Sequence, residues 1–342
     1  MRTKIILIII LISSLAFSQE ESSKKKKDKM KFGGNAAIGL DLKVIGGLND
    51  RVVNDSRLNR IGVVETELKI LPADSIELEF DLEFDYRFKD INLKKLFVRY
   101  NFDNSNARLG FMKKMFSLEE IKGKSDNLFI KKSIIHNILE DFYLFGNDFT
   151  AQYRYNFPSY TLIGGYSIDG SNRHFVNLTL LTRQFQKARF VAAGMYMNYK
   201  EKGHPDETER KHAFFGNLGM EFDGKHNNFE LEGVWGKNPE NRSYSTLLGN
   251  LIYTEREGIG FFGARFQESF PIKIGRKYLN KIVPIYELSF IDISDIYFQI
   301  RPAINFNFTP KDRLQWRTNL DLNFNQNDLI SQRVVTAIFV TW

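Results

Sequence analysis

The sequence predicts an all-β protein, a transmembrane antiparallel β-barrel. Residues 76–88, IELEFDLEFDYRF, alternate apolar and charged side chains without a break, which is the period of a β-strand. Similar segments of about ten to fourteen residues recur after Phe32, and a tilted membrane strand needs about 9–11 residues, against five or six in an average soluble sheet. The mean hydropathy of −0.32 excludes a bundle of membrane-spanning helices.

The one long apolar run lies at the start of the chain. Residues 5–15, IILIIILISSL, follow Arg2 and Lys4 and precede Ala16-Phe17-Ser18. A basic start, a short apolar core and a small-residue exit are typical of a secretory signal peptide, so we expect residues 1–18 to be removed. The alternative is an N-terminal membrane anchor, but the run is short for the roughly 20 residues that a spanning helix needs.

The formal net charge of +7 is concentrated near the N-terminus. Two of the 48 basic residues lie in 1–18 and six in 19–31, so 40 remain from Phe32 onward, against 38 acidic residues. We expect 19–31 to be an exposed basic tail that could touch anionic lipid headgroups, and 32–342 to be one nearly neutral barrel domain. An exported chain does not meet nucleic acid. With no cysteine it has no disulfide and no lipoprotein acylation site.

The pattern indicates about seventeen candidate strands separated by Gly, Asn, Asp and Pro. The clearest are 76–88, 94–102, 146–157, 172–185, 188–200, 211–223, 227–237, 244–256, 258–270, 294–308, 312–325 and 332–342.

Two architectures use many long alternating strands. A secreted β-sandwich hides its apolar faces between two sheets, whereas a membrane barrel turns them to lipid. Strand length and the aromatic residues near segment ends favour the barrel. The chain also ends on Trp342, in a final strand similar to the recognition signal of outer-membrane barrels.

The alternation at 76–88 assigns two faces to that strand. Five carboxylates in a dry core would each need a partner, so we expect them to face a water-filled lumen, with the apolar row facing lipid. By parity, Lys69, Lys95 and Arg99 share the acidic face, where cross-strand pairs contribute roughly 0.2–1 kcal/mol each. The predicted lumen-facing acidic row is Glu77, Glu79, Asp81, Glu83 and Asp85.

One region resembles the phosphate-selective porin O/P family. Residues 108–120, RLGFMKKMFSLEE, are similar to the family phrase R-x-G-Q-F-K-x-P-F-x-L-E-E, and residues 129–134, FIKKSI, to F-M-E-R-S-L. The sequence departs from the family at Phe111 in place of Gln, Met115 in place of Pro, Lys131 in place of an acid and Lys132 in place of Arg. The resemblance implies an outer-membrane barrel of sixteen strands, a homotrimer, with a loop folded into the lumen.

The residues themselves also predict an inner loop. Alternation fails from Ser117 to Phe145, and the segment carries apolar side chains that need burial, so we expect 117–145 to pack against the wall as a constriction loop. Rings of lysine or arginine inside a pore favour anions. The alternative is that these lysines are solvated and balanced by nearby acids. The candidate anion path is Arg108, Lys113, Lys114, Lys122, Lys124, Lys131 and Lys132.

The sequence carries no motif that predicts an enzyme. Each of the five histidines lacks a matching Ser or Asp phrase, and neither a metal-binding spacing nor a phosphate-binding glycine loop is present, so we expect no cofactor and no metal site. The leading hypothesis is a porin that passes small anions, phosphate first, and is surrounded by outer-membrane lipids. The alternatives are a barrel with a plugged lumen in a structural, surface or assembly role, and a secreted β-sandwich binding module.

Overall fold

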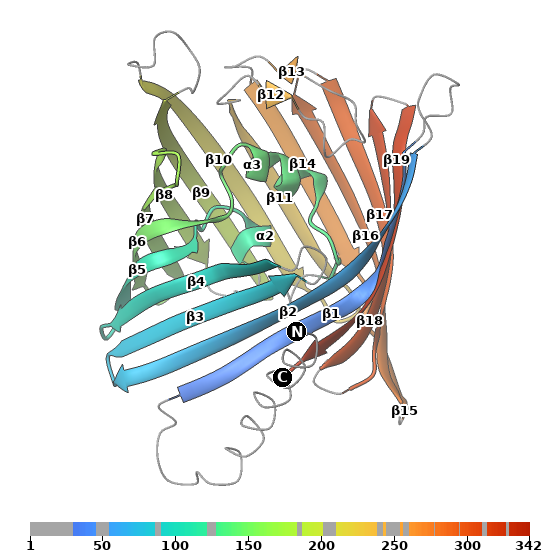
Figure 1. Cartoon of the computed structure of the whole chain (residues 1–342), viewed down its shortest axis with the longest axis horizontal. Coiled ribbons are helices and arrows are strands. Elements are labelled where there is room, and N and C mark those ends of the chain that lie inside the picture. The colour runs from blue at the N-terminus through green and yellow to red at the C-terminus, as the bar shows by residue number, and fades with distance from the viewer. Residues whose placement is uncertain are drawn as a thin grey trace.

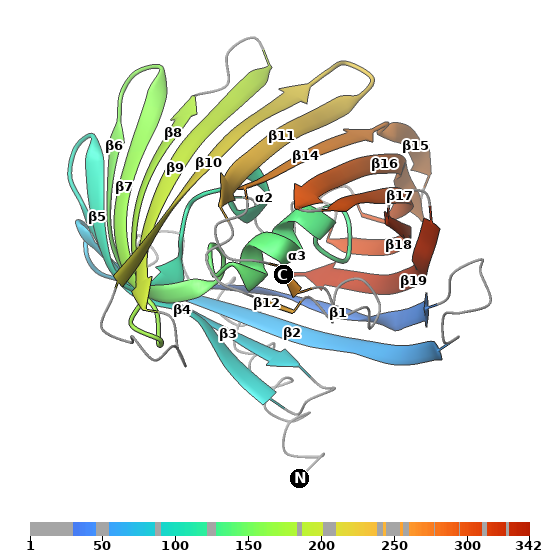
Figure 2. The ribbon, with the colours of Figure 1, turned by 90° about the horizontal axis from the view of Figure 1, so that it is seen from above.

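In the computed structural model the chain forms one closed β-barrel with a segment folded inside it (Figures 1 and 2). The structure describes residues 30–45, 55–85, 90–121, 128–182, 187–200, 210–237, 242–243, 254–255, 260–276, 278–293, 295–309, 313–325 and 328–342. The expected signal peptide and nearly all of the expected basic tail therefore lie outside the described residues.

The barrel has sixteen antiparallel transmembrane strands, as expected, when β14 and β15 are counted as one. β14 and β15 are two parts of one strand that is interrupted at Phe270-Pro271, since both pair with β16. Its strands are β1 (Met30–Ile45), β2 (Asp55–Ala73), β3 (Ile76–Asp85), β4 (Asp90–Asn101), β5 (Ser105–Lys113), β6 (Asn147–Asn156), β7 (Tyr160–Ile168), β8 (His174–Thr182), β9 (Ala188–Lys200), β10 (Arg210–Asp223), β11 (Asn228–Lys237), β14 (Gly260–Ser269), β15 (Ile272–Arg276), β16 (Leu279–Ile293), β17 (Asp295–Asn307), β18 (Leu314–Asn325) and β19 (Asp328–Thr341).

The first and last strands close the barrel. β1 pairs with β19 from Asn35↔Thr341 to Ile45↔Ser331. The backbone N–H of Trp342 donates to the carbonyl of Gly34 at 3.1 Å, and Gly34 N–H donates back at 3.3 Å. A Cβ on Gly34 would lie 2.7 Å from the Trp342 ring and 2.3 Å from the Glu65 carbonyl oxygen, so this position requires glycine. The aromatic terminus is thus part of the closing seam.

The two ends of the barrel differ. Tight turns such as Asp74-Ser75 and residues 102–104 lie at the end where β1 begins and β19 ends. The opposite end carries the longer connections. One of them contains the two-residue strands β12 (Arg242–Ser243) and β13 (Thr254–Glu255), which pair with each other and form a separate small sheet. We call these the turn end and the loop end.

The two faces of the wall have opposite chemistry. Outward residues such as Ile38, Leu109 and Phe214 are 72%, 54% and 69% exposed, whereas inward positions carry buried polar groups such as Asp41 and Arg301. This is the arrangement of a barrel whose outside meets lipid and whose inside is polar. Among the described residues, no helix is long and apolar enough to cross a membrane.

Most of the predicted segments coincide with strands. Residues 188–200 are β9 as expected, and 227–237 begins one residue before β11. The segment 294–308 is the second arm of a hairpin, β16–β17, whose first arm at 279–293 was not among the clearest segments. Of the segment 244–256, residues 244–253 and 256 lie outside the described residues and 254–255 form β13.

The closing seam yields a prediction about Gly39. A Cβ at Gly39 would lie 2.0 Å from the Thr336 carbonyl oxygen and 2.6 Å from Ala337 Cα, both backbone atoms of β19. We expect Gly39→Ala to lower the free energy of unfolding by about 1–3 kcal/mol, because a strand must shift. Heat-induced gel mobility in detergent measures the folded fraction. Gly164→Ala is the matched control, since nothing lies within 4 Å of its Cβ position; equal stability of the two variants would contradict the prediction.

Candidate pore and its inner segment

Between β5 and β6, the described residues 114–121 and 128–146 lie inside the barrel (Figure 2). We call these residues the inner segment. It contains helix α2 (Leu118–Ile121) and helix α3 (Ile134–Asp141). Ser133 caps α3, accepting a hydrogen bond from the His136 N–H at 3.1 Å. The helix ends near Tyr143, which has a positive φ of 63°.

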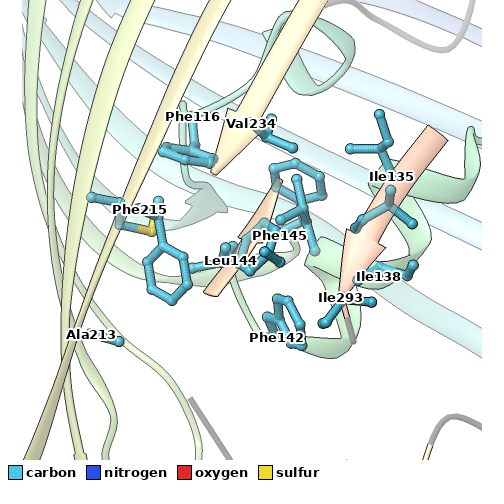
Figure 3. Packing of buried hydrophobic residues seen from close by; sticks show 14 of the residues in the cluster. Phe116, Ile135, Ile138, Phe142, Leu144, Phe145, Ala213, Phe215, Val234 and Ile293 are labelled. Carbon is cyan, nitrogen blue, oxygen red and sulfur yellow. The ribbon is translucent and has the colours of Figure 1, made fainter. Parts of the chain in front are cut away.

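An apolar cluster fixes the inner segment to one wall (Figure 3). The sequence IIHNIL places Ile134, Ile135, Ile138 and Leu139 on α3, and all four are buried. Inward side chains of β8 to β11, β14, β16, β17 and β19 complete the cluster, among them Phe215, Val234, Phe261 and Ile293. Because this part of the inner face is apolar and covered, the segment fills the lumen next to it.

Polar side chains of the same wall bind the backbone of the inner segment. Glu232 Oε1 accepts from Leu118 N–H at 2.7 Å, and Gln299 Oε1 accepts from Ile134 N–H at 3.0 Å. Arg301 Nη2 donates to the Lys131 carbonyl at 2.5 Å, and Asn305 Nδ2 donates to the Leu128 carbonyl at 2.9 Å. These bonds satisfy main-chain groups that an irregular buried segment would otherwise leave unpaired.

Glu119 joins the two helices of the inner segment. Its carboxylate accepts from Ser133 N–H at 3.2 Å and from Ser133 Oγ at 2.7 Å, and His136 Nδ1 lies 3.9 Å from Oε2. Burial alone would raise the pKa of Glu119. His136, Arg265, Lys132 and the Ser133 hydrogen bond instead hold this pKa well below its usual range.

Two buried arginines organise the wall behind the inner segment. Arg265 lies 3.1 Å from Glu230, 3.3 Å from Glu232 and 3.4 Å from Glu287. Glu287 also pairs with Arg301, whose Nη1 lies 2.8 Å from Glu287 Oε1. The register of β14, β16 and β17 makes this possible, since Arg265 opposes Ser289 while Glu287 opposes Arg301. Buried charges require such partners.

The acidic row of β3 lies on the same sheet face as Asp41, which contacts Lys131 of the inner segment at 3.7 Å. The expected ion pairs are present. Arg99 lies 3.0 Å from Glu77, and Lys95 lies 3.1 Å from Glu79 and 3.7 Å from Asp81. Lys69 also reaches Glu79 at 3.7 Å, and Lys94 reaches Glu83 at 2.9 Å. Most of the negative charge of this wall is therefore locally balanced.

Three arginines gather on the next strands. Arg99 on β4 directly opposes Arg108 on β5, and Arg154 on β6 opposes Asn106, two residues from Arg108. Arg108 Nε donates to Asn106 Oδ1 at 3.1 Å. Within the described part of the chain, neither Arg108 nor Arg154 forms an ion pair with a carboxylate, and Arg154 Nε is buried without a hydrogen-bond partner. We call Arg99, Arg108 and Arg154 the arginine row.

The predicted lysines occupy different places. Lys131 is 28% exposed beside Asp41, and Lys132 Nζ lies 3.5 Å from the Glu119 carbonyl. The strand register places Lys113 on the outward face with Leu109, so we remove Lys113 from the anion path. Lys122 and Lys124 lie outside the described residues.

Lys114 is also removed from the anion path. Its side chain is 1% exposed, pairs with Asp148 and lies 4.0 Å from the centroid of the Phe175 ring. Burial lowers the pKa of Lys114 from its usual value, although the nearby Asp148 carboxylate partly offsets this lowering. This lysine anchors the start of the inner segment rather than contacting a solute.

The sequence reasoning missed Arg154 and the two buried arginines, Arg265 and Arg301. Arg154 could have been found by parity, because it alternates with the outward Tyr153 and Tyr155 in β6. Arg265 and Arg301 carried no comparable signal, since their partners come from other strands whose register only the fold defines. Within the described ranges, no group of three metal-ligating side chains could hold a metal ion.

No protein-family model matches the sequence, and no curated protein matches it by sequence. Solved structures do match. The fold is that of the porins. OmpT, an outer-membrane protein of Vibrio cholerae, matches with a TM-score of 0.58 and 11% identity over 92% of this chain and 99% of that chain, in a structure described as a trimer form.

Two further porin-like structures are similar. The outer-membrane channel DcaP of Acinetobacter baumannii matches with a TM-score of 0.61 and 13% identity over 93% of this chain and 99% of that chain. An anion-selective porin from Comamonas acidovorans matches with a TM-score of 0.60 and 12% identity over 92% and 99%. These likenesses support the barrel fold and do not single out the phosphate-selective family.

The Glu119 contacts yield a prediction about the inner segment. Because the pKa of this carboxyl is lower in the folded protein than in the unfolded one, its stabilisation is present at neutral pH. This stabilisation is lost only as the pH falls through the pKa that Glu119 has in the folded protein. We expect Glu119→Gln to speed amide exchange in residues 128–146 at pH 7 about tenfold, since a buried donor loses its acceptor. Wild-type exchange, corrected for its intrinsic rate, should stay constant from pH 7 to pH 5.

Hydrogen–deuterium exchange read by mass spectrometry measures this. Glu140→Gln, at an exposed position of α3, is the control and should leave the protection unchanged. Equal exchange in all three proteins would show that Glu119 does not hold the segment.

Proposed function

We propose that this chain is an outer-membrane porin of a Gram-negative-type bacterium, through which small anionic solutes diffuse passively. Apolar side chains of the inner segment pack against β8 to β11, β14, β16, β17 and β19, and Ile130 also packs against Ala37 of β1 and Ile61 of β2. We therefore expect the water-filled route to run beside β3 to β6. The constriction would then lie between β3 to β6 and the described residues of the inner segment. Phosphate is the first solute to test, since the resemblance around Arg108 suggests it.

The arginine row carries this proposal. Ion pairs balance most of the acidic row, whereas Arg108 and Arg154 bring cationic groups to the inner face without carboxylate partners among the described residues. Low-dielectric walls focus such a field on the solution between them, which raises the local concentration of anions. The guanidinium groups also match phosphate oxygens in geometry.

The apolar cluster of the inner segment favours one alternative, a barrel whose lumen is plugged and which has a structural or assembly role. That reading predicts a folded barrel without measurable conductance. A conducting channel with defined selectivity would exclude it.

The selectivity of single channels tests the porin proposal. In a planar bilayer under a KCl gradient, we expect a zero-current potential that favours chloride and a current reduced by millimolar phosphate. Arg108→Gln alone should lower the chloride-to-potassium permeability ratio about fivefold, and Arg108→Gln with Arg154→Gln should lower it further. The fivefold change corresponds to about 1 kcal/mol for one charge at close range in water. Lys237→Gln, which removes an exposed charge from the outward face, should change nothing. A cation-favouring potential in the wild type would overturn the anion proposal.

We also propose that three copies assemble, as in the trimer form of the Vibrio protein. Light scattering on the protein in mild detergent, corrected for bound detergent, should give three times the mass of the mature chain. A monomer that conducts with the same selectivity would refute the trimer and leave the porin proposal intact.

A further inference from the structure

A group of basic and imidazole side chains lies on the outward face at the loop end. β8 begins at His174, β9 ends at Lys200, β10 begins at Arg210 and β11 ends at Lys237. The ladders place these residues in rows. Lys200 opposes Arg210, and His174, Asn198 and His212 form the next row toward the turn end. We call these six residues, with Asn198 included, the rim patch.

The rim patch borders the apolar band that faces lipid. The row below it contains Val176, Tyr196 and Phe214, of which Val176 is 50% and Phe214 is 69% exposed. Trp235, two residues before Lys237, is 42% exposed on the same face. Aromatic side chains in this position mark the level of lipid headgroups. The rim patch therefore lies where lipid headgroups, rather than the lumen, surround the protein.

The charge of the rim patch is positive and uncompensated among the described residues. Lys200, Arg210 and Lys237 are exposed, and none forms an ion pair there. The nearby Asp169, in the β7–β8 connection, is already held by Arg173 at 2.5 Å and by two backbone N–H groups. No carboxylate stands at the described outward positions of these rows.

Hydrogen bonds orient the rim patch before any ligand binds. Tyr196 Oη lies 2.5 Å from His212 Nδ1, and their rings stack at 5.6 Å. Arg210 is exposed, and its Nη1 donates to Asn198 Oδ1 at 2.7 Å, which fixes one side of the guanidinium group. If Tyr196 donates to His212, the opposite imidazole nitrogen carries the proton and can donate to a ligand. Arginine and imidazole N–H groups held together are well suited to phosphate oxygens.

We propose that the rim patch binds the phosphate groups of a phosphorylated lipid in the membrane leaflet at the loop end. The inference rests on the proposed membrane location but not on solute selectivity. A lipid fits better than a soluble anion because the site pairs cations with an exposed apolar surface directly beneath them. The lipid phosphate would contact Arg210 and His212, and its acyl chains would cover Val176 and Phe214.

Native mass spectrometry of the full chain in detergent tests the proposal. Diphosphoryl lipid A should bind more tightly than its monophosphoryl form, and phosphatidylcholine more weakly than both. Lys200→Gln with Arg210→Gln should weaken lipid A binding roughly twenty-five-fold, about fivefold for each cation removed. Arg276→Gln, an exposed charge removed at the turn end of β15, is the matched control and should bind like the wild type.

Two outcomes would overturn the proposal: equal binding of lipid A by the double variant and the wild type, or equal affinity of the wild type for lipid A and phosphatidylcholine. Heat-induced gel mobility confirms that each variant is folded. Conductance is recorded on the same samples, so that loss of lipid binding with normal conductance separates this inference from the porin proposal. Lipid binding by a barrel that does not conduct would support the lipid-binding proposal for the rim patch and refute the porin proposal.

Discussion

The pairing of β1 with β19 is the constraint on which the rest of the structure depends. A sheet edge exposed to lipid would leave a row of backbone N–H and C=O groups without partners, and each would cost several kcal/mol. Closure removes both edges and joins residues separated by most of the chain, such as Gly34 and Trp342. It also divides space into an inside and an outside, so that every alternating strand has one face for each.

Closure alone leaves an interior too wide for wall side chains to fill, and the inner segment occupies part of it. The segment lies against one side because the inward face is not uniform. From β8 to β17 its loop-end half carries residues such as Met195, Met197 and Phe215, which need an apolar partner. α3 supplies that partner. Glu232 and Gln299 accept from the first N–H groups of α2 and α3, and Arg301 donates to a carbonyl between the two helices. The remaining lumen is bordered by charged side chains.

The features that the sequence predicted follow from a period of two. The strand at 76–88, its acidic face and the opposing Lys69, Lys95 and Arg99 all depend on parity, which a one-dimensional pattern contains. Parity also places Lys113 outside, but only once β5 is known to continue through that residue. The burial of Lys114 depends on Asp148 and Phe175, which lie across two further strands. Those contacts are set by register and by the path of the inner segment, neither of which a local pattern encodes.

The same reasoning explains why net composition is a poor guide to the charge that a solute meets. The body of the chain is nearly neutral, and its clearest acidic strand is balanced by cations on both neighbouring strands. Arg265 and Arg301 are likewise taken up by buried carboxylates behind the inner segment. What remains is local: a few cations whose strand neighbours are other arginines or amides. Among the described residues these include Arg108 and Arg154 inside the lumen and Lys200 and Arg210 on the outer rim, so the two proposed anion-binding surfaces would arise from one barrel of almost zero net charge.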